Sequence, residues 1–178
     1  MRDDEQVDTS VLTTLFAHNT WANVKLLDFC EGLSDAQLDA TAIGCFGSIR
    51  ATLVHIVGAE MSYVERVNGK LPPQPLAADQ FPGFAVLKEV ARWAGDELLD
   101  LARSARADTI VRQRPPRMRI AYPLASLIVQ TVTHSTEHRT QISAIITQLG
   151  LEPPDMSGWN YMEETGELQD VEAGEGAS

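Results

Sequence analysis

Apolar residues recur every three or four positions along four long stretches of the chain, which is the spacing of amphipathic α-helices. The first stretch runs from Val11 to Leu33, and Gly32 frays its end. The second runs from about Ser48 to Asn68, with Ser48 as a cap or first-turn residue and Gly69 at the stop. The first half of the chain is therefore predicted to form two long helices.

The second half of the chain shows the same spacing twice. One predicted helix covers about residues 84–107. The other is opened by Pro123, because a missing N–H is tolerated in the first turn, and it is closed by Gly150. No strand pattern competes seriously with these helices, although a short extended pair within residues 108–121 stays open.

The segments between and after the helices set the domain organisation. Residues 70–84 contain four prolines and a glycine, which forbids regular helix and suits a long crossover between bundle helices. Residues 152–161 are predicted to form an ordered extension, because they contain Trp159 and Tyr161. The predicted architecture is an all-α four-helix bundle over residues 1–165, with a long crossover between the second and third helices and a disordered acidic tail over residues 166–178.

Composition and charge narrow the function classes. The 178 residues fit one domain with a single core, and 44% of them are hydrophobic, as in ordinary globular proteins. The formal net charge is -11, a field that repels a phosphate backbone, so nucleic acid is not an expected partner. Six of the acidic residues fall after residue 162, so much of the acidity belongs to the tail.

The chain shows no signal for secretion or membrane insertion. Residues 1–10 are polar and acidic, and nowhere do eighteen apolar residues follow one another. Cys30 and Cys45 do not form a C-x-x-C pair and are interpreted as reduced thiols, with core packing favoured over a reactive role. We therefore expect a cytoplasmic protein that does not use a membrane as a partner.

The fourth predicted helix carries the strongest chemical signal. His134 and His138 lie one turn apart within its core-facing stripe, so their rings project to the same side. This spacing is used to bind a divalent metal with two imidazole nitrogens. The alternatives are a hydrogen-bonded pair of core histidines and an exposed face.

A metal site needs further donors, because catalytic zinc sites usually take three ligands from the protein. His55 lies at the edge of the apolar stripe of the second predicted helix, among small residues that leave room around its ring. Taken alone, His55 is an ordinary half-buried histidine. Together with His134 and His138 it completes a set of three, which favours metal binding.

Two further residues are candidates for the surroundings of this site. His18 stands within a turn of Trp21 on the first predicted helix, either lining the same cavity or lying at the surface. Glu60 falls near the middle of the apolar stripe of the second, where a carboxylate must be paired or solvated. It is interpreted either as a partner of an arginine or buried hydroxyl, or as a hydrogen-bond acceptor or proton carrier for the site.

Short motifs spread along the chain resemble the DinB-like metal-binding four-helix proteins, the DinB/YfiT-like superfamily of metal-dependent hydrolases. The matching segments are residues 19–23 (NTWAN), Gly47-Ser48-Ile49, residues 52–56 (TLVHI) with Ala59-Glu60, residues 134–139 (HSTEHR) with Gln141, Leu149-Gly150 and Pro153-Pro154-Asp155. They occur in the right order and span nearly the whole chain up to Tyr161. Their combination is specific, whereas each segment alone is weak.

This resemblance implies a four-helix bundle that holds a divalent ion, zinc or nickel, near one end. The ligands carried over are His55, His134 and His138, and Gln141 is a pocket residue. The family often has histidine where this chain has Glu137 and glycine where it has Thr140, so the surroundings of the ligands differ. The resemblance also implies a homodimer.

The reaction is less closely specified than the ligands. Some proteins that resemble this chain are thiol S-transferases or thiol-dependent isomerases. This favours thiol transfer over hydrolysis, with a small-molecule substrate and a low-molecular-weight thiol as partners. Glu137 also creates an H-x-x-E-H pattern similar to the inverted zinc-peptidase motif, but only forty residues follow it, too few for that enzyme's further ligand and domain. A non-catalytic bundle with a structural or sensory metal is the alternative. A structural site should be closed by a fourth protein ligand, for which Glu60 and Glu137 are the candidates, and Trp21 and Glu137 are also candidate pocket residues.

Overall fold

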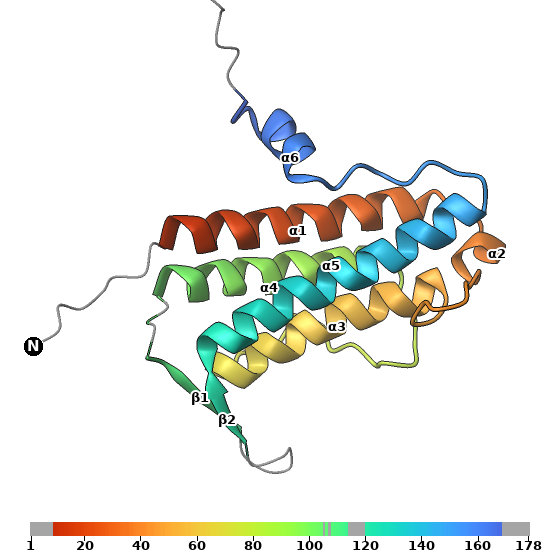
Figure 1. Ribbon diagram of the computed structural model, residues 1–178. Helices are drawn as coiled ribbons and strands as arrows, with labels where there is room; N and C mark the ends of the chain where they lie inside the picture. Colours follow the sequence, from red (N-terminus) through yellow and green to blue (C-terminus); the bar gives the residue numbers. More distant parts are fainter. Residues whose placement is uncertain (1–8, 105, 107, 114–119, 169–178) are drawn as a thin grey trace, which may run out of the picture.

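The computed structural model describes residues 9–104, 106, 108–113 and 120–168. Four long helices lie side by side in it (Figure 1): α1 (Thr9–Glu31), α3 (Ile49–Asn68), α4 (Phe84–Ser104) and α5 (Leu124–Gln148). Each of these helices packs against two of the others, in the cyclic order α1, α4, α3, α5. The predicted all-α four-helix bundle is confirmed.

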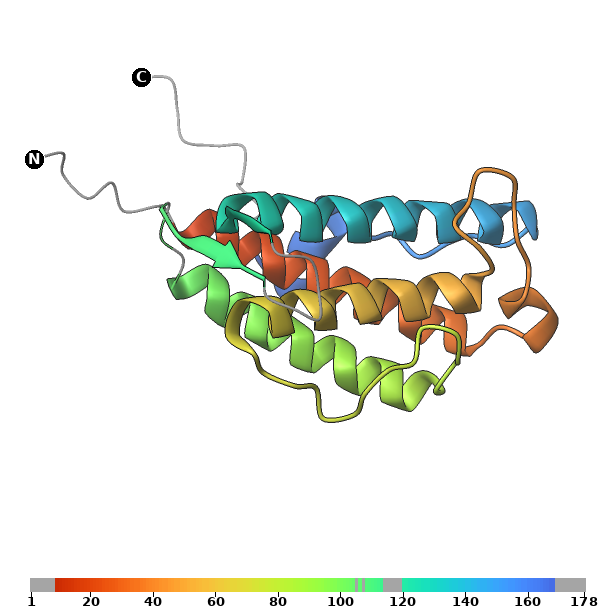
Figure 2. The same ribbon diagram turned by 90° about the horizontal axis from the view of Figure 1, so that it is seen from below.

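The crossover follows from the directions of the helices. The helices α3 and α4 are neighbours that run in the same direction, so the chain must return along the whole bundle between them. The connection after Asn68 does this along the outside of the bundle (Figure 2). The prolines predicted to exclude helix here leave this connection without a helix or strand, as expected.

Local sequence signals set most of the helix ends. The Ser48 side chain accepts a hydrogen bond from the Ala51 N–H at the start of α3, and Gly69 ends that helix at a φ of 74°. Pro123 is the N-cap of α5 and lies just outside it, so the helix begins at Leu124, one residue after the predicted start. The third predicted helix ends at Ser104, three residues earlier than expected.

Three short elements complete the fold. Helix α2 (Asp35–Leu38) begins with a capping box between Ser34 and Gln37, and helix α6 (Gly158–Thr165) lies within and just beyond the predicted ordered extension. The strands β1 (Ile110–Arg112) and β2 (Ala121–Pro123) pair in antiparallel fashion, so the extended pair that the sequence left open is present. Neither short helix was identified separately from the sequence, because one turn or two of helix gives little periodicity.

Two apolar clusters fill the bundle, one toward each end. The first joins the later part of α1 to the early parts of α3 and α4, and the second joins the opposite parts, with Phe16, Leu98 and Leu124 among its members. A layer of buried polar side chains lies between them at the middle of α1, α3 and α5: Asn19, Asn23, Glu60, Ser135, His138 and Arg139. The chemistry of the molecule is therefore concentrated halfway along the bundle, and not near one end as the family resemblance implied.

The remaining sequence predictions concern the thiols, the membrane and the tail. Cys30 is a free cysteine in the first core cluster, and burial raises the pKa of its thiol to about 12, which fits a packing role. None of the described helices combines the length and the apolar character of a transmembrane segment. Of the predicted tail, only residues 166–168 are described, and the rest lies outside the described residues.

Candidate metal centre

Three histidines meet between α3 and α5. His55 comes from α3, and His134 and His138 come from successive turns of α5. One ring nitrogen of each lies within 4.8 Å of the corresponding atom of the others. The geometry thus brings together the three residues that the sequence proposed as ligands.

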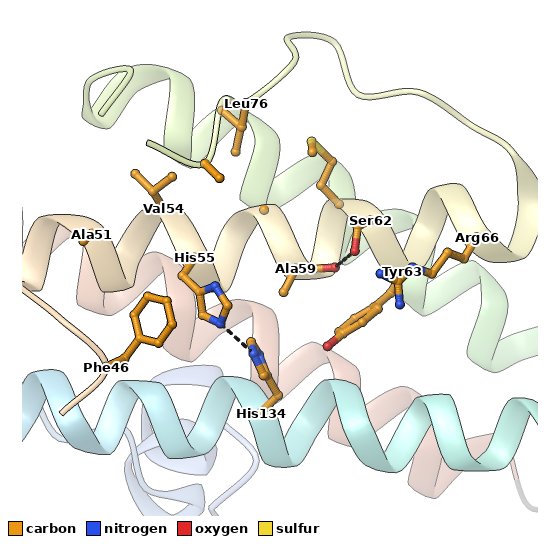
Figure 3. A pocket seen from close by; sticks show the side chains of 13 residues that line it. Phe46, Ala51, Val54, His55, Ala59, Ser62, Tyr63, Arg66, Leu76 and His134 are labelled. Carbon is orange, nitrogen blue, oxygen red and sulfur yellow. Dashed lines mark hydrogen bonds between the residues drawn. The ribbon is translucent and has the colours of Figure 1, made fainter. Parts of the chain in front are cut away.

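The ring nitrogens are already close to a binding arrangement. The Nε2 atoms of His55 and His134 are 2.9 Å apart, which Figure 3 shows as a dashed line. The His138 ring stands edge-on to both of the others, with its centroid 4.7 Å from that of His55 and 4.5 Å from that of His134. The arrangement is compact enough for one ion to contact all three imidazoles.

Gln141 fixes the third ring. The backbone N–H of Phe46 donates to Oε1 of Gln141 (3.1 Å), which identifies that atom as the oxygen. The same oxygen lies 2.9 Å from Nδ1 of His138, so Nδ1 carries the proton and Nε2 has a free lone pair. Histidine ligands of metals are commonly oriented by such a partner on the other ring nitrogen.

The environment of two of the histidines favours their uncharged form. Burial, with a smaller contribution from the neighbouring histidines, lowers the pKa of His134 to about 4. The pKa of His55 is also lowered, first by burial and then by His138. Neutral imidazole is the form that binds metals. The Nδ1 atom of His134 is buried without a hydrogen-bond partner.

Phe46 is a site residue that the sequence analysis missed. Its ring stacks on His55 at a centroid distance of 4.0 Å and stands edge-on to His138 at 5.1 Å. Phe46 is 53% exposed. Its ring therefore lies at the surface and covers one side of the histidines. It lies in a loop before α3, and nothing in the local pattern predicts that this loop folds back over the ring of His55.

A pocket of about 460 Å³ opens beside the histidines. His55, Tyr63 and Arg66 line it from α3, His134 from α5, Phe46 from the loop before α3 and Leu76 from the crossover (Figure 3). This volume is in the range of small-molecule sites. The crossover predicted from its prolines thus contributes a wall of the pocket.

The other sequence candidates lie outside this pocket. His18 donates from Nε2 to the carbonyl of Met156 (3.0 Å) and packs against Trp21 and Tyr161, so it helps to attach the C-terminal segment to α1. Trp21 donates to Glu164 of α6. Glu137 is exposed and is not among the residues whose ligand atoms group with the histidines.

Glu60 is the centre of a buried hydrogen-bond cluster on the other side of α3. Its Oε1 accepts from Asn19 (2.7 Å), Asn23 (2.8 Å) and Ser135 (2.6 Å). Arg139 donates to the side-chain oxygens of the same two asparagines, at 2.8 and 2.6 Å. Both structural partners considered from sequence are therefore found: Glu60 bonds a buried hydroxyl directly and an arginine through the asparagines.

Among the described residues, the histidine group has no fourth ligand. Within the part of the chain that the structure describes, no cysteine, aspartate or glutamate joins the three histidines. The thiol of Cys45 instead contacts the carbonyl of Gln141 at 3.6 Å. Three protein donors with an adjoining pocket are typical of catalytic metal sites rather than structural ones.

Comparison with known proteins gives a consistent result. The sequence model of the DinB family matches residues 5–172. The chain is also similar to the protein named "Protein DinB" from Bacillus subtilis (strain 168), with 24% identity over 162 residues, which is 85% of this chain and 94% of that protein.

Proposed function

The chain belongs to the DinB family, and from this premise we propose that it is a metal-dependent enzyme acting on a small molecule. His55, His134 and His138 are the proposed ligands of a divalent ion, and the adjoining pocket is the proposed substrate site. Zinc and nickel, both of which imidazole donors suit, are the proposed ions. A bound ion would supply a positive charge that makes a thiol or a water molecule a stronger nucleophile at neutral pH.

The observation that carries this proposal is the open side of the histidine group. A structural metal is normally enclosed by four protein ligands, whereas these three histidines have no fourth partner among the described residues. Two of them, His55 and His134, line a pocket of about 460 Å³. This arrangement favours catalysis over a structural or sensory metal, which remains the alternative function.

The surrounding residues have definable positioning roles. Gln141 keeps the proton of His138 on Nδ1 and turns Nε2 toward the other histidines. The Phe46 ring covers the face of His55 and limits the access of water from that side. Ser135 and Arg139 alternate with the two ligands along α5, and their bonds in the Glu60 cluster hold that helix in register.

Within this proposal, transfer of a low-molecular-weight thiol is favoured over hydrolysis. Apolar side chains next to the histidines, Val54 and Leu76 among them, suit the carbon skeleton of a thiol or of its acceptor. The proposal includes a cytoplasmic location, consistent with the free thiols of Cys30 and Cys45. It also includes a homodimer, as the family resemblance implies.

Cobalt substitution tests metal binding and the reaction type together. We expect the protein purified without a histidine tag to bind one cobalt ion, and a small thiol added to it to produce an intense near-ultraviolet charge-transfer band. His55→Ala, His134→Ala and His138→Ala should each lose most of the metal, since one of three donors is removed. His18→Ala is the matched control and should retain the metal, because His18 bonds Met156 instead.

The outcomes separate the candidate functions. Full metal in any of the three histidine variants removes that residue from the ligand set. If no thiol in a broad panel changes the spectrum, thiol transfer is wrong. Hydrolysis then becomes the favoured reaction if water at the metal exchanges. If this water does not exchange, a structural metal becomes the favoured interpretation.

A further inference from the structure

Arg66 is a cationic side chain in the pocket wall that has no counter-ion among the described residues. Its Nε–H is buried and has no hydrogen-bond partner, and no carboxylate of the described residues lies within ion-pair distance of its guanidinium. The guanidinium carbon lies 5.4 Å from the centre of the Tyr63 ring. Figure 3 shows Arg66 and Tyr63 together on the same face of α3 as His55.

The partly or fully buried cations elsewhere in the described part of the chain have partners. Arg50 pairs with Asp35 and Asp39, and Lys88 pairs with Asp28 and Glu31. The buried guanidinium of Arg139 donates to the oxygens of Asn19 and Asn23. An unmet N–H of a charged group is unfavourable in a buried position. Arg66 is thus poised for a partner that the described protein residues do not supply.

The pocket is electrostatically suited to an anion. No aspartate or glutamate is among its described lining residues, although the whole chain has a net charge of -11. The Tyr63 hydroxyl accepts from Gln130 at 3.4 Å, which leaves its own proton for a ligand. Both features favour a negatively charged group near Arg66 over a neutral or cationic one.

We propose that Arg66 anchors the anionic group, a carboxylate or a phosphate, of the small molecule that occupies this pocket. The proposal rests on the proposed function, because it assigns the far end of the molecule whose reacting group meets the histidines. A guanidinium presents N–H donors in a planar fork that matches two oxygens of a carboxylate or phosphate. The Nε–H that is unpartnered in the structure belongs to that fork.

The spacing along α3 defines the shape of such a ligand. Arg66 follows His55 by eleven residues, which corresponds to about 16 Å along the helix axis at 1.5 Å per residue. The Arg66 side chain extends over the ring of Tyr63, so its guanidinium lies closer to His55 than this backbone distance indicates. The small and apolar residues between them, Ala59 and Met61, line the intervening wall. The ligand is therefore an elongated molecule with an anionic end and a reactive end.

Anion binding to the metal-free protein tests the anchor independently of the metal. After treatment with a chelator, the protein is titrated with inorganic phosphate, with glutarate and with the neutral isostere glutaramide, while the ¹⁵N resonance of the Arg66 Nε–H is followed. We expect at least one anion to bind and to shift this resonance, and Arg66→Gln to weaken its binding about tenfold or more. Arg66→Lys should restore part of the affinity, since it keeps the charge without the fork.

Arg92→Gln is the matched control, because Arg92 is an exposed arginine of α4 and is not a lining residue of the pocket. It should leave anion binding unchanged. The anchor is wrong if neither anion binds to the wild type, if glutaramide binds as well as glutarate, or if Arg66→Gln binds the anions as tightly as the wild type. The relative affinities of phosphate and glutarate identify the preferred anionic group.

The result is separable from the test of the proposed function. Cobalt binding by Arg66→Gln should equal that of the wild type, since Arg66 is not among the proposed ligands. If the wild-type protein binds no metal but binds an anion through Arg66, the proposed metal-dependent enzyme is contradicted and the role of Arg66 as the anion anchor stands. If the protein binds metal but its anion binding does not depend on Arg66, the anchor is wrong and the proposed metal site is unaffected.

Discussion

The three histidines of the candidate metal centre differ in their surroundings, although all three are proposed as ligands. His138 has a fixed proton through Gln141, whereas Nδ1 of His134 is buried without a partner and its Nε2 faces that of His55. Burial and the adjacent histidines lower the pKa of His134 to about 4. The lowered pKa of His134, together with the lowered pKa of His55, makes the stability of the metal-free protein depend on pH.

We predict that the metal-free protein loses stability as the pH falls from about 6.5, the usual histidine pKa, toward the lowered pKa of His134. In this window the unfolded chain binds a proton that folded His134 does not, so the free energy of unfolding decreases with decreasing pH and levels off below the lowered value. Urea unfolding at several pH values measures this. His134→Asn should show a shallower dependence, and an unchanged dependence would show that His134 does not contribute.

Helix pairs of the bundle approach one another to different extents. Gly95 of α4 faces Thr20 of α1, and a Cβ at Gly95 would lie 2.3 Å from Oγ1 and 2.9 Å from Cβ of Thr20. Contact with a Cβ atom cannot be relieved by rotating the threonine side chain. Gly58 of α3 differs, since a Cβ there would meet no atom within 4 Å. The first glycine is therefore required by packing, whereas the second is not.

We predict that Gly95→Ala lowers the free energy of unfolding by about 1–3 kcal/mol, because the overlap forces α1 and α4 apart. Gly58→Ala should raise it by about 0.5–1 kcal/mol, because alanine is the better helix former and has space. Chemical denaturation of both variants checks the signs. The double variant Gly95→Ala/Thr20→Ala should recover part of the loss, and equal effects of the two glycine substitutions would contradict the packing argument.

Across the whole molecule, the Glu60 cluster joins three helices of the bundle at its middle. Glu60 belongs to α3, its asparagine partners to α1, and Ser135 and Arg139 to α5. The carboxylate and the guanidinium compensate one another through the asparagines, although burial lowers the pKa of Arg139 to about 10. Buried charges of this kind are strongly unfavourable when one partner is removed.

We predict that Glu60→Gln and Arg139→Gln each destabilise the protein by about 3 kcal/mol, because each leaves one buried charge without its opposite. The double variant should be less destabilised than the sum of the two, since both charges are then removed. Thermal and urea unfolding of the four proteins measure this coupling. Strict additivity would show that Glu60 and Arg139 act independently.

The periodic spacing of apolar residues, together with the proline, glycine and capping residues between the helices, determined most of the fold from the sequence. The four long helices, the proline-rich crossover and the ends at Ser48 and Gly69 follow from side-chain spacing and from backbone preferences that act within a few residues. The spacing of His134 and His138 likewise fixes their common face, because the helix period does so for any chain. The sequence also predicted His55 as the third member, which the structure brings together with the pair.

The tertiary structure alone decided which distant residues share a surface. The sequence placed His18 near the site as one of two alternatives, yet the packing of the C-terminal segment on α1 gives it Met156 and Tyr161 as partners. Phe46 reaches His55, and Arg66 lines the pocket, because the loop before α3 and the crossover fold back across that helix. These contacts depend on the paths of irregular segments, which no helical or strand period encodes, so only the folded chain specifies them.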